Sequence, residues 1–319
     1  MRILGMLATI KRMDIYRRTM TIILALICIN LNAQNQTKKN DFLITDDSTM
    51  LFVTKSGSGP ICIFIHGGPG TWSESFEDMK GNNLETNLSM VYYDQRGCGR
   101  SGKSISGNYS VDRMIKDIDL IRKHYHVKKV YLLSHSFGGI LAVNYALKYP
   151  NHVKGLILAN STLNIRKSLE NQINYINSLL KTNFTPSDST STSIMLTFLN
   201  AKKVLSAKKM SYKMLSDNKK SVDLLEKIDS KNPSDYDFAQ KAFQIDDYWK
   251  DYTKITKQID MPVLIITGKK DHSVGEEHYL LFNFKNEKVR KIDGGHLLYY
   301  ENNKEFINSI FRFIKETNK

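Results

Sequence analysis

The sequence predicts an α/β fold with a mostly parallel, doubly wound sheet and an inserted helical lid. In residues 41–159 and 259–319, short apolar runs alternate with segments of helical periodicity. Strands separated by helices pair in parallel within one sheet. Residues 160–258 are instead rich in Lys, Ser and Asn and have helical patterns with many large apolar side chains. We therefore expect a core in two parts, 41–159 and 259–319, with a helical lid (cap) at 160–258.

The predicted strands and helices follow from their apolar patterns. A hairpin surrounds Asp46, Asp47 and Ser48, and continuous apolar runs after it are typical of strands buried on both faces. The expected strands are Phe42–Thr45, Met50–Thr54, Ile61–Ile65, Ser89–Tyr93, Val130–Leu133, Val153–Ala159, Pro262–Thr267 and Val289–Ile292. Helical spacing predicts core helices within 111–126 and at Gly138–Tyr149, Glu276–Phe282 and Lys304–Lys315.

The N-terminal segment has the pattern of a signal peptide. An apolar run from Thr21 to Leu31 follows the basic residues Lys11, Arg12, Arg17 and Arg18, and Ala33 has the small side chain of a cleavage position. The run is shorter than the roughly 20 residues that span a bilayer. We expect a signal peptide at residues 1–33 and an exported protein, periplasmic or secreted, without stable membrane insertion after cleavage. An uncleaved anchor is the alternative, and Met13 or Met20 is an alternative start.

The formal net charge of +14 indicates no particular partner, because the basic residues are dispersed along the chain. No nucleic-acid-binding motif accompanies them, so we expect a solvated basic surface and no nucleic acid. The three cysteines form neither a disulfide framework nor a metal-ligand spacing. The chemistry proposed below requires no cofactor and no metal. Cys98, in a Gly-rich loop, is an alternative nucleophile to the serine described next.

The segment SHSFGG, Ser134–Gly139, joins a predicted strand to a predicted helix and contains the candidate nucleophile Ser136. In a nucleophile elbow of the pattern G-x-S-x-G, the serine lies on a tight, strained turn. Small residues two positions before and after it are needed because the strand and helix backbones crowd there. Here Ser134 replaces the first glycine. The N–H of Phe137, at the helix N-terminus, is the expected first oxyanion donor. An ordinary serine in a turn is the alternative.

A serine hydroxyl needs a base within hydrogen-bond reach. His296 is the expected base, because it follows the last predicted strand and parallel sheets place active sites at the carboxyl ends of strands. Asp271 follows the strand Pro262–Thr267 and is the expected acid that orients the base. The order Ser136, Asp271, His296 is the order this type of elbow requires. Three other carboxylates precede that strand and are weaker rivals: Asp246, Asp247 and Asp251.

The loop HGGPG, residues 66–70, follows the first buried strand, where a second oxyanion donor is expected. Two adjacent glycines let backbone N–H groups approach a substrate oxygen closely. Gly68 is the first choice for this donor and Gly67 is the second. A Gly/Pro turn with no catalytic role is the alternative.

Four segments together resemble one family. HGGPG, DQRGCGRS, SHSFGG and GGHLLYYENNKEF look like those of the proline iminopeptidases, which are prolyl aminopeptidases of the α/β-hydrolase fold. The resemblance covers about residues 42–159 and 260–315 and leaves out the lid. It implies a triad of Ser136, Asp271 and His296, with Gly68 and Phe137 lining the oxyanion hole. The family commonly has Gly and Trp at positions 134 and 137, and often Cys-Pro at positions 273 and 274, where this chain has Ser-Val.

The resemblance also implies a substrate. The family draws from its lid a carboxylate that pairs with a free amino terminus, and Glu170 and Glu226 are the candidates by charge. We expect an exported serine hydrolase that forms an acyl-enzyme and releases N-terminal proline, or a similar small residue, from peptides. The alternatives are a hydrolase of carboxylic esters or other small acyl groups on the same triad, and a non-catalytic ligand-binding protein of this fold. The expected partner is a small peptide or acyl compound, and the sequence does not specify an oligomeric state.

Overall fold

The eight strands form one sheet in which spatial order differs from chain order. In the computed structural model, which describes residues 39–234 and 236–318, the order is β1-β2-β4-β3-β5-β6-β7-β8. β2 is antiparallel to β4, and every neighbouring pair from β4 to β8 is parallel. The predicted α/β class with a mostly parallel sheet is confirmed. The strands are β1 (Lys39–Ile44), β2 (Met50–Ser56), β3 (Ile61–Ile65), β4 (Ser89–Tyr93), β5 (Val130–His135), β6 (Val153–Ala159), β7 (Val263–Gly268) and β8 (Glu287–Ile292).

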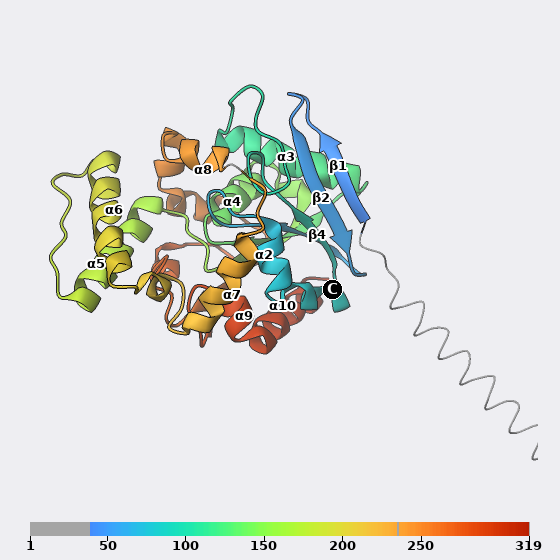
Figure 1. The fold of residues 1–319 in the computed structure, drawn as a ribbon. Coiled ribbons are helices and arrows are strands. Elements are labelled where there is room, and N and C mark those ends of the chain that lie inside the picture. Colours follow the sequence, from blue (N-terminus) through green and yellow to red (C-terminus); the bar gives the residue numbers. More distant parts are fainter. Residues whose placement is uncertain (1–38, 235, 319) are drawn as a thin grey trace, which may run out of the picture. The chain divides into compact units, whose positions relative to one another are not determined.

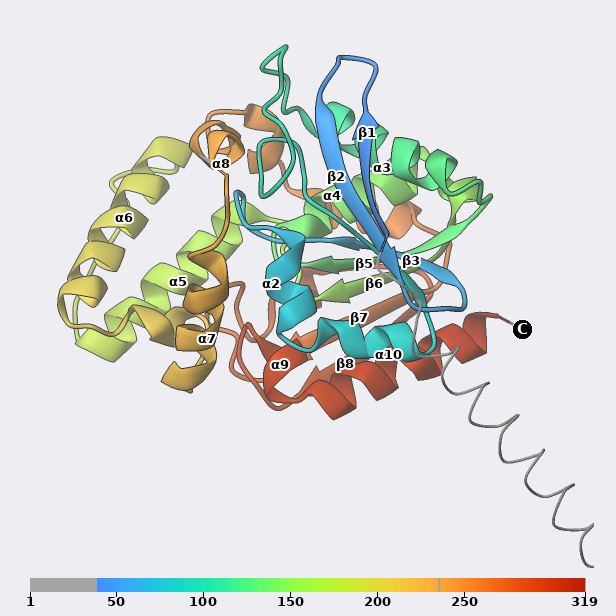
Figure 2. The same ribbon diagram turned by 45° about the vertical axis from the view of Figure 1, so that its right-hand side comes forward.

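Alternate side chains of the central strands enter two separate cores on opposite faces of the sheet. In β3, Ile63 and Ile65 belong to one buried cluster, whereas Cys62 and Phe64 belong to the other. The first cluster includes side chains of α3 (Val111–His124) and α4 (Gly138–Lys148), and the second includes side chains of α2 (Ser73–Asp78) and α10 (Asn303–Thr317). These helices cover the two faces of the sheet (Figures 1 and 2), so the sheet is doubly wound as expected.

The chain between β6 and β7 is helical. Its described residues contain α5 (Ile165–Leu180), α6 (Ser191–Ala207), η3 (Ser211–Met214), α7 (Lys219–Asp229), α8 (Asp237–Ala242), η4 (Asp246–Trp249) and η5 (Tyr252–Gln258), and no strand. α5 and α6 lie side by side over a small core of their own (Figures 1 and 2). α7 packs beside α2. The lid therefore contacts the core through α7 and also through η5, which packs against α4, and residues Asn40–Lys319 form one compact unit.

The segment after β7 departs from the predicted helix Glu276–Phe282. Only a single 3-10 turn forms there, η6 (His278–Leu281). Gly275 precedes it with φ +103°, a left-handed conformation that an α-helix cannot include. A Cβ at this position would lie 2.1 Å from the Asn171 side chain of α5, so the lid presses directly on this turn. The short elements α2, η1 (Gly81–Thr86), η2 (Pro150–His152) and α9 (Leu298–Glu301) lie outside the predicted helices.

The N-terminal prediction concerns residues that the structure does not describe. The proposed signal peptide, 1–33, lies outside the described ranges. Among the residues within them, no helix is both long enough and apolar enough to cross a membrane. The same residues contain no cluster of three or more His, Cys, Asp and Glu side chains that could hold a metal ion.

Candidate active site

Ser136 occupies a strained turn between β5 and α4. Its φ is +54°, a conformation that non-glycine residues adopt rarely. The backbones crowd as the elbow pattern predicts, because a Cβ at Gly138 would lie 2.3 Å from the Ile65 carbonyl oxygen. Ser134 fits despite its extra hydroxymethyl group, since its buried Oγ lies 3.0 Å from Ser161 Oγ, within hydrogen-bond distance. The departure at position 134 therefore leaves the turn intact.

Asp271 and His296 are brought together by the ends of β7 and β8. The Nδ1 atom of His296 lies 2.9 Å from Asp271 Oδ2, and both residues are buried. Oδ1 of Asp271 also accepts the N–H groups of Ser273 and Val274. Burial alone would raise the pKa of Asp271, but His296 and these hydrogen bonds outweigh it and hold the pKa below its ordinary value. Asp271 is therefore an anion that orients the imidazole and leaves Nε2 available.

The loop carrying His296 is held by the neighbouring strand ends. His135, next to Ser136 in the elbow, donates from Nε2 to the His296 carbonyl oxygen at 2.9 Å. Burial lowers the pKa of His135 to about 3, so this imidazole stays neutral and has a fixed tautomer. Asn160, at the end of β6, donates to the carbonyl oxygens of Gly295 and His296. These bonds fix the main chain of the candidate base.

Ser136 and His296 line one cavity of about 250 Å³. No hydrogen bond joins their side chains among the residues described, and such bonds often tighten only when substrate binds. The other lining residues are largely apolar and aromatic, with one carboxylate. They include Phe64, Trp72, Phe76, Leu215, Leu225, Asp229, Leu297 and Tyr299. The cavity combines a hydroxyl, an imidazole and an acid within an apolar wall.

The loop after β3 reaches the same cavity. Gly67 lies against the elbow, because a Cβ there would fall 2.9 Å from Ser136 Cβ. The Gly67 carbonyl oxygen accepts hydrogen bonds from Thr71 Oγ1 and from His66 Nδ1, both at 2.9 Å. In a trans peptide the next N–H points the opposite way, so the Gly68 amide points away from those two side chains. Gly67 and Gly68 both line the cavity.

The histidine of HGGPG supports this loop. His66 accepts the Gln95 backbone N–H at Nε2 (2.9 Å), so Nδ1 is the protonated nitrogen that donates to Gly67. Gln95 also donates from its side chain to the His66 carbonyl oxygen at 2.8 Å. Burial lowers the pKa of His66, which keeps it neutral. Hydrogen bonds between His66 and Gln95 therefore join the motifs HGGPG and DQRGCGRS into one scaffold of two loops.

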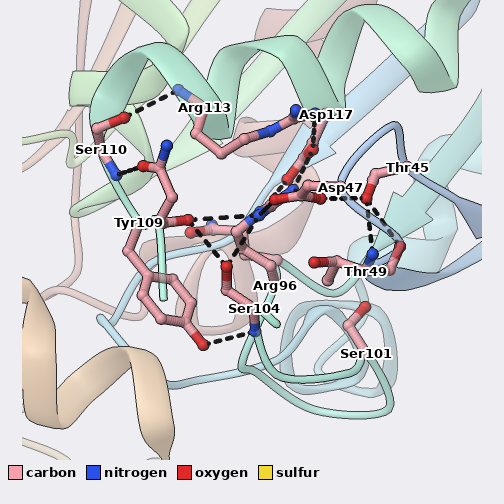
Figure 3. A network of polar contacts seen from close by, with 12 residues as sticks. Thr45, Asp47, Thr49, Arg96, Ser101, Ser104, Tyr109, Ser110, Arg113 and Asp117 are labelled. Atoms are coloured by element: carbon pink, nitrogen blue, oxygen red, sulfur yellow. Dashed lines mark hydrogen bonds and ion pairs between the residues drawn. The ribbon is translucent and has the colours of Figure 1, made fainter. Parts of the chain in front are cut away.

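Arg96, in the second motif, anchors that scaffold to α3 (Figure 3). Its guanidinium is fully buried and pairs with both oxygens of Asp117, at 2.7 and 2.8 Å, and with Asp47 at 2.7 Å. Asp94 binds the Ser73 hydroxyl at 2.7 Å and Arg100 Nε at 2.8 Å. These charged residues hold loops and do not line the cavity. The motif that carried much of the family resemblance thus has a structural task.

The lid carboxylates predicted for substrate binding are not at the cavity. Glu170 pairs with Lys167 on α5 at 3.0 Å, and Glu226 is exposed on α7. The lid carboxylate that lines the cavity is Asp229, the last residue of α7. Leu225 lines it too, one helical turn earlier, so this face of α7 is turned toward Ser136. The i, i+4 spacing places Leu225 and Asp229 on one face of α7, but only the packing against α2 shows that this face lines the cavity.

Asp229 is held in place by two donors from α2 and the residue before it. Its Oδ1 accepts Trp72 Nε1–H at 3.0 Å and the Ser75 hydroxyl at 2.5 Å. Oδ2 has no hydrogen bond to any described residue. Burial raises the pKa of Asp229, although both donors oppose the rise. A partly buried carboxylate with a spare oxygen is suited to a cationic or hydrogen-bond-donating group in the cavity.

The rival residues lie elsewhere. Cys98 is fully buried, and burial raises the pKa of its thiol, so it remains a thiol at neutral pH. Asp247 pairs with Lys250, and Asp251 accepts the Thr253 N–H at the start of η5. None of these residues, nor Asp246, lines the cavity with Ser136.

Comparison with known proteins assigns the family. The family model described as alpha/beta hydrolase fold matches residues 60–303. A proline iminopeptidase of Thermoplasma volcanium is 35% identical over 96 residues, which is 30% of this chain and 32% of that protein. One of Saccharolobus solfataricus is 35% identical over 106 residues, 33% of this chain and 34% of that protein. The chain thus matches about a third of the length of these curated relatives, and the resemblance to proline iminopeptidases is confirmed.

Solved structures show the same fold at low sequence identity. A proline iminopeptidase-related protein of Thermus thermophilus superposes with a TM-score of 0.69 at 20% identity, covering 88% of this chain and 98% of that one. An esterase of Exiguobacterium antarcticum gives a TM-score of 0.65 at 19% identity, covering 87% and 100%. Because both superpose about equally well, the fold does not select a substrate.

Proposed function

This chain belongs to the alpha/beta hydrolase fold family, and on that premise we propose that it is a serine hydrolase with Ser136 as nucleophile, His296 as base and Asp271 as orienting acid. The observation that carries the proposal is that His296, hydrogen-bonded to Asp271, lines the same cavity as Ser136, which lies on a strained elbow. A ligand-binding protein without catalysis would have no need of a strained serine beside an oriented imidazole.

The proposed mechanism is acyl transfer. His296 takes the Ser136 proton, and Oγ attacks the substrate carbonyl carbon to give a tetrahedral intermediate. The Phe137 and Gly68 amides, with Gly67 the second choice, donate to its oxyanion. Collapse expels the amine or alcohol, which receives the proton from His296. Water, deprotonated by the same histidine, then releases the acid and restores Ser136. Asp271 stabilises the imidazolium and stays ionised, as its lowered pKa favours.

The proposed substrate is a peptide with a free N-terminal proline or a similar small residue. The cavity volume, about 250 Å³, is just below the roughly 300–1,000 Å³ of typical ligand sites, which suits one small residue. Its aromatic wall suits an apolar ring, and Asp229 is the carboxylate for the substrate ammonium. The similarity to proline iminopeptidases supports this substrate class.

An amide substrate panel tests the proposal. N-acetylation of proline p-nitroanilide turns the ammonium that would meet Asp229 into an uncharged amide that carries an added acetyl group. We expect kcat/KM to fall by more than tenfold on acetylation, because a charge-assisted hydrogen bond worth about 1.5–3 kcal/mol is lost. Equal values for the two substrates would remove the aminopeptidase and leave a general acyl hydrolase.

The second candidate is an esterase on the same triad. The largely apolar wall and the superposition with an esterase favour it. An esterase would turn over p-nitrophenyl esters in preference to proline amides and would be indifferent to a free amine. Measuring kcat/KM for both classes of substrate on one preparation separates the two candidates.

We also propose export, on the basis of the basic segment and apolar run within residues 1–33. N-terminal sequencing of the protein from periplasmic or secreted fractions should give a chain that begins after Ala33. A chain that retains residues 1–33 in the membrane fraction would instead support the anchor.

A further inference from the structure

The loop carrying His296 lies directly against one turn of the lid. The His296 N–H donates to the Leu215 carbonyl oxygen at 2.8 Å. A Cβ at Gly295 would lie 2.6 Å from that same oxygen and 3.2 Å from Ser216 Cα, so this approach needs glycine. The Leu215 side chain lines the cavity. One lid residue thus touches the substrate space and holds the main chain of the base.

Glu301, in the core, hydrogen-bonds to both sides of the contact between the His296 loop and the lid. It is the last residue of α9, and its Oε2 accepts the Gly295 N–H at 2.6 Å. Its Oε1 accepts the hydroxyl of Ser216, which is 1% exposed. One carboxylate therefore bridges the residue before His296 and the residue after Leu215. This gives a task to the glutamate of the motif GGHLLYYENNKEF, which the proposed mechanism does not use.

The lid helix α7 connects this contact to the opposite wall of the cavity. Ser216 Oγ accepts the N–H of Asn218, the residue that caps α7, at 2.9 Å. The other end of α7 is Asp229, hydrogen-bonded to α2. α7 has 11 residues, so it spans about 16 Å between these two contacts. α7 therefore joins Asp229, on the cavity wall, to Ser216 and Leu215 at the loop of His296.

We infer that Glu301 and Ser216 are positioning residues that couple the seating of the lid to the placement of His296. With the lid seated, Leu215 and Glu301 hold the base loop at the cavity that Ser136 also lines. With the lid displaced, the loop loses its bond from the His296 N–H to Leu215, and Glu301 loses its partner Ser216. The inference rests on the proposed function, because it requires His296 to be the base.

The experiment compares Glu301→Gln, Ser216→Ala and the double variant. Two rates are measured, kcat on proline p-nitroanilide and the rate of Ser136 labelling by a small fluorophosphonate, which reports activation of the serine without lid-bound substrate. We expect each single variant to lower both rates by about tenfold with KM unchanged, as loss of one charge-assisted hydrogen bond predicts. The double variant should be no worse than the more severe single, because the two side chains act as one unit.

A matched control pair lies at the other end of the sheet. Ser56, at the end of β2, donates to Glu85 at 2.6 Å, the same combination of hydroxyl and carboxylate. Ser56→Ala and Glu85→Gln should change neither rate. If this pair lowers both rates as much as the Glu301 pair does, the effect is general destabilisation and the inference is wrong.

Other results separate the inference from the proposed function. A rise in KM with unchanged labelling would mean that Glu301 serves only the lid, which overturns the coupling. Labelling at Ser136 that is identical in wild type and in Glu301→Gln overturns it as well and leaves the triad standing. Absence of labelling and turnover in the wild type refutes the proposed function itself. Should Glu301→Gln fail to fold, Ser216→Ala alone decides, since it removes one hydroxyl.

Discussion

The substitution Asp229→Asn tests substrate recognition, because it should lower activity on a free-amine substrate without lowering the stability of the fold. Asn keeps an oxygen where Oδ1 accepts from Trp72 and Ser75, at 3.0 and 2.5 Å, so the end of α7 should stay in place. The second oxygen becomes an NH₂ group, which cannot accept from an ammonium. The loss is one charge-assisted hydrogen bond, about 1.5–3 kcal/mol, or roughly 10- to 150-fold in kcat/KM on proline p-nitroanilide.

Asp229→Asn should not lower the stability of the folded protein, although it lowers activity. Burial raises the pKa of Asp229, so the folded protein disfavours its charged form, and the ionised carboxylate lowers stability at pH values above its unfolded pKa. Removing the charge should leave Tm unchanged or raise it. The raised pKa also predicts that wild-type kcat/KM on the free amine falls with acidification at a higher pH than an exposed aspartate would give.

The assay has two controls. p-Nitrophenyl acetate has no amine, so Asp229→Asn should leave its hydrolysis unchanged. Glu226→Gln, on the same helix but exposed, should leave both substrates unchanged. The reasoning is refuted if Asp229→Asn slows the ester as much as the amide, or if Glu226→Gln reproduces the loss on the amide.

Three further predictions concern the triad and the scaffold. Ser136→Ala should abolish turnover and fluorophosphonate labelling, and His296→Ala should cost a similar amount because a triad acts as a unit; a label on another residue contradicts this. Arg96→Met should lower the free energy of unfolding in urea by about 1.5–3 kcal/mol, since buried Asp117 keeps Arg113 as a partner but loses both hydrogen bonds to the Arg96 guanidinium; a loss below about 1 kcal/mol would contradict the buried network. Burial alone would raise the pKa of Asp119, but hydrogen bonds from basic neighbours lower it to about 2. Its stabilisation should therefore be complete above its unfolded pKa and disappear as the pH falls toward 2, visible as a drop in Tm that Asp119→Asn lacks.

The local signals in the sequence were sufficient for the sheet and for the candidate triad. Strands such as Ile61–Ile65 are buried on both faces, so a continuous apolar run identifies them without knowledge of their partners. Ser136 follows β5 directly, and Asp271 and His296 lie a few residues after the ends of β7 and β8. Because the carboxyl ends of parallel strands share one edge of a sheet, their positions after the strands are enough to predict that these three residues lie together.

Tertiary packing determines which carboxylate of the lid lines the cavity. Glu170, Glu226 and Asp229 have similar local surroundings in the sequence, and charge cannot rank them. Asp229 reaches the cavity because α7 packs beside α2, where Trp72 and Ser75 bind its carboxylate across more than 150 positions of the chain. No periodicity within the lid contains that information.

The tasks of the polar and charged residues in the motifs were also decided by the tertiary structure. In the sequence, Gln95 and Arg96 belong to a motif that marks a family, and Glu301 is one acid in a closing helix. In the folded protein, Gln95 fixes His66, Arg96 is buried between Asp47 and Asp117, and Glu301 joins the lid to the loop of His296. Sequence patterns determine which residues lie on a strand or helix, because that depends on neighbours along the chain. The partner of a buried charge depends on which distant segments fold against it, and only the tertiary structure determines that.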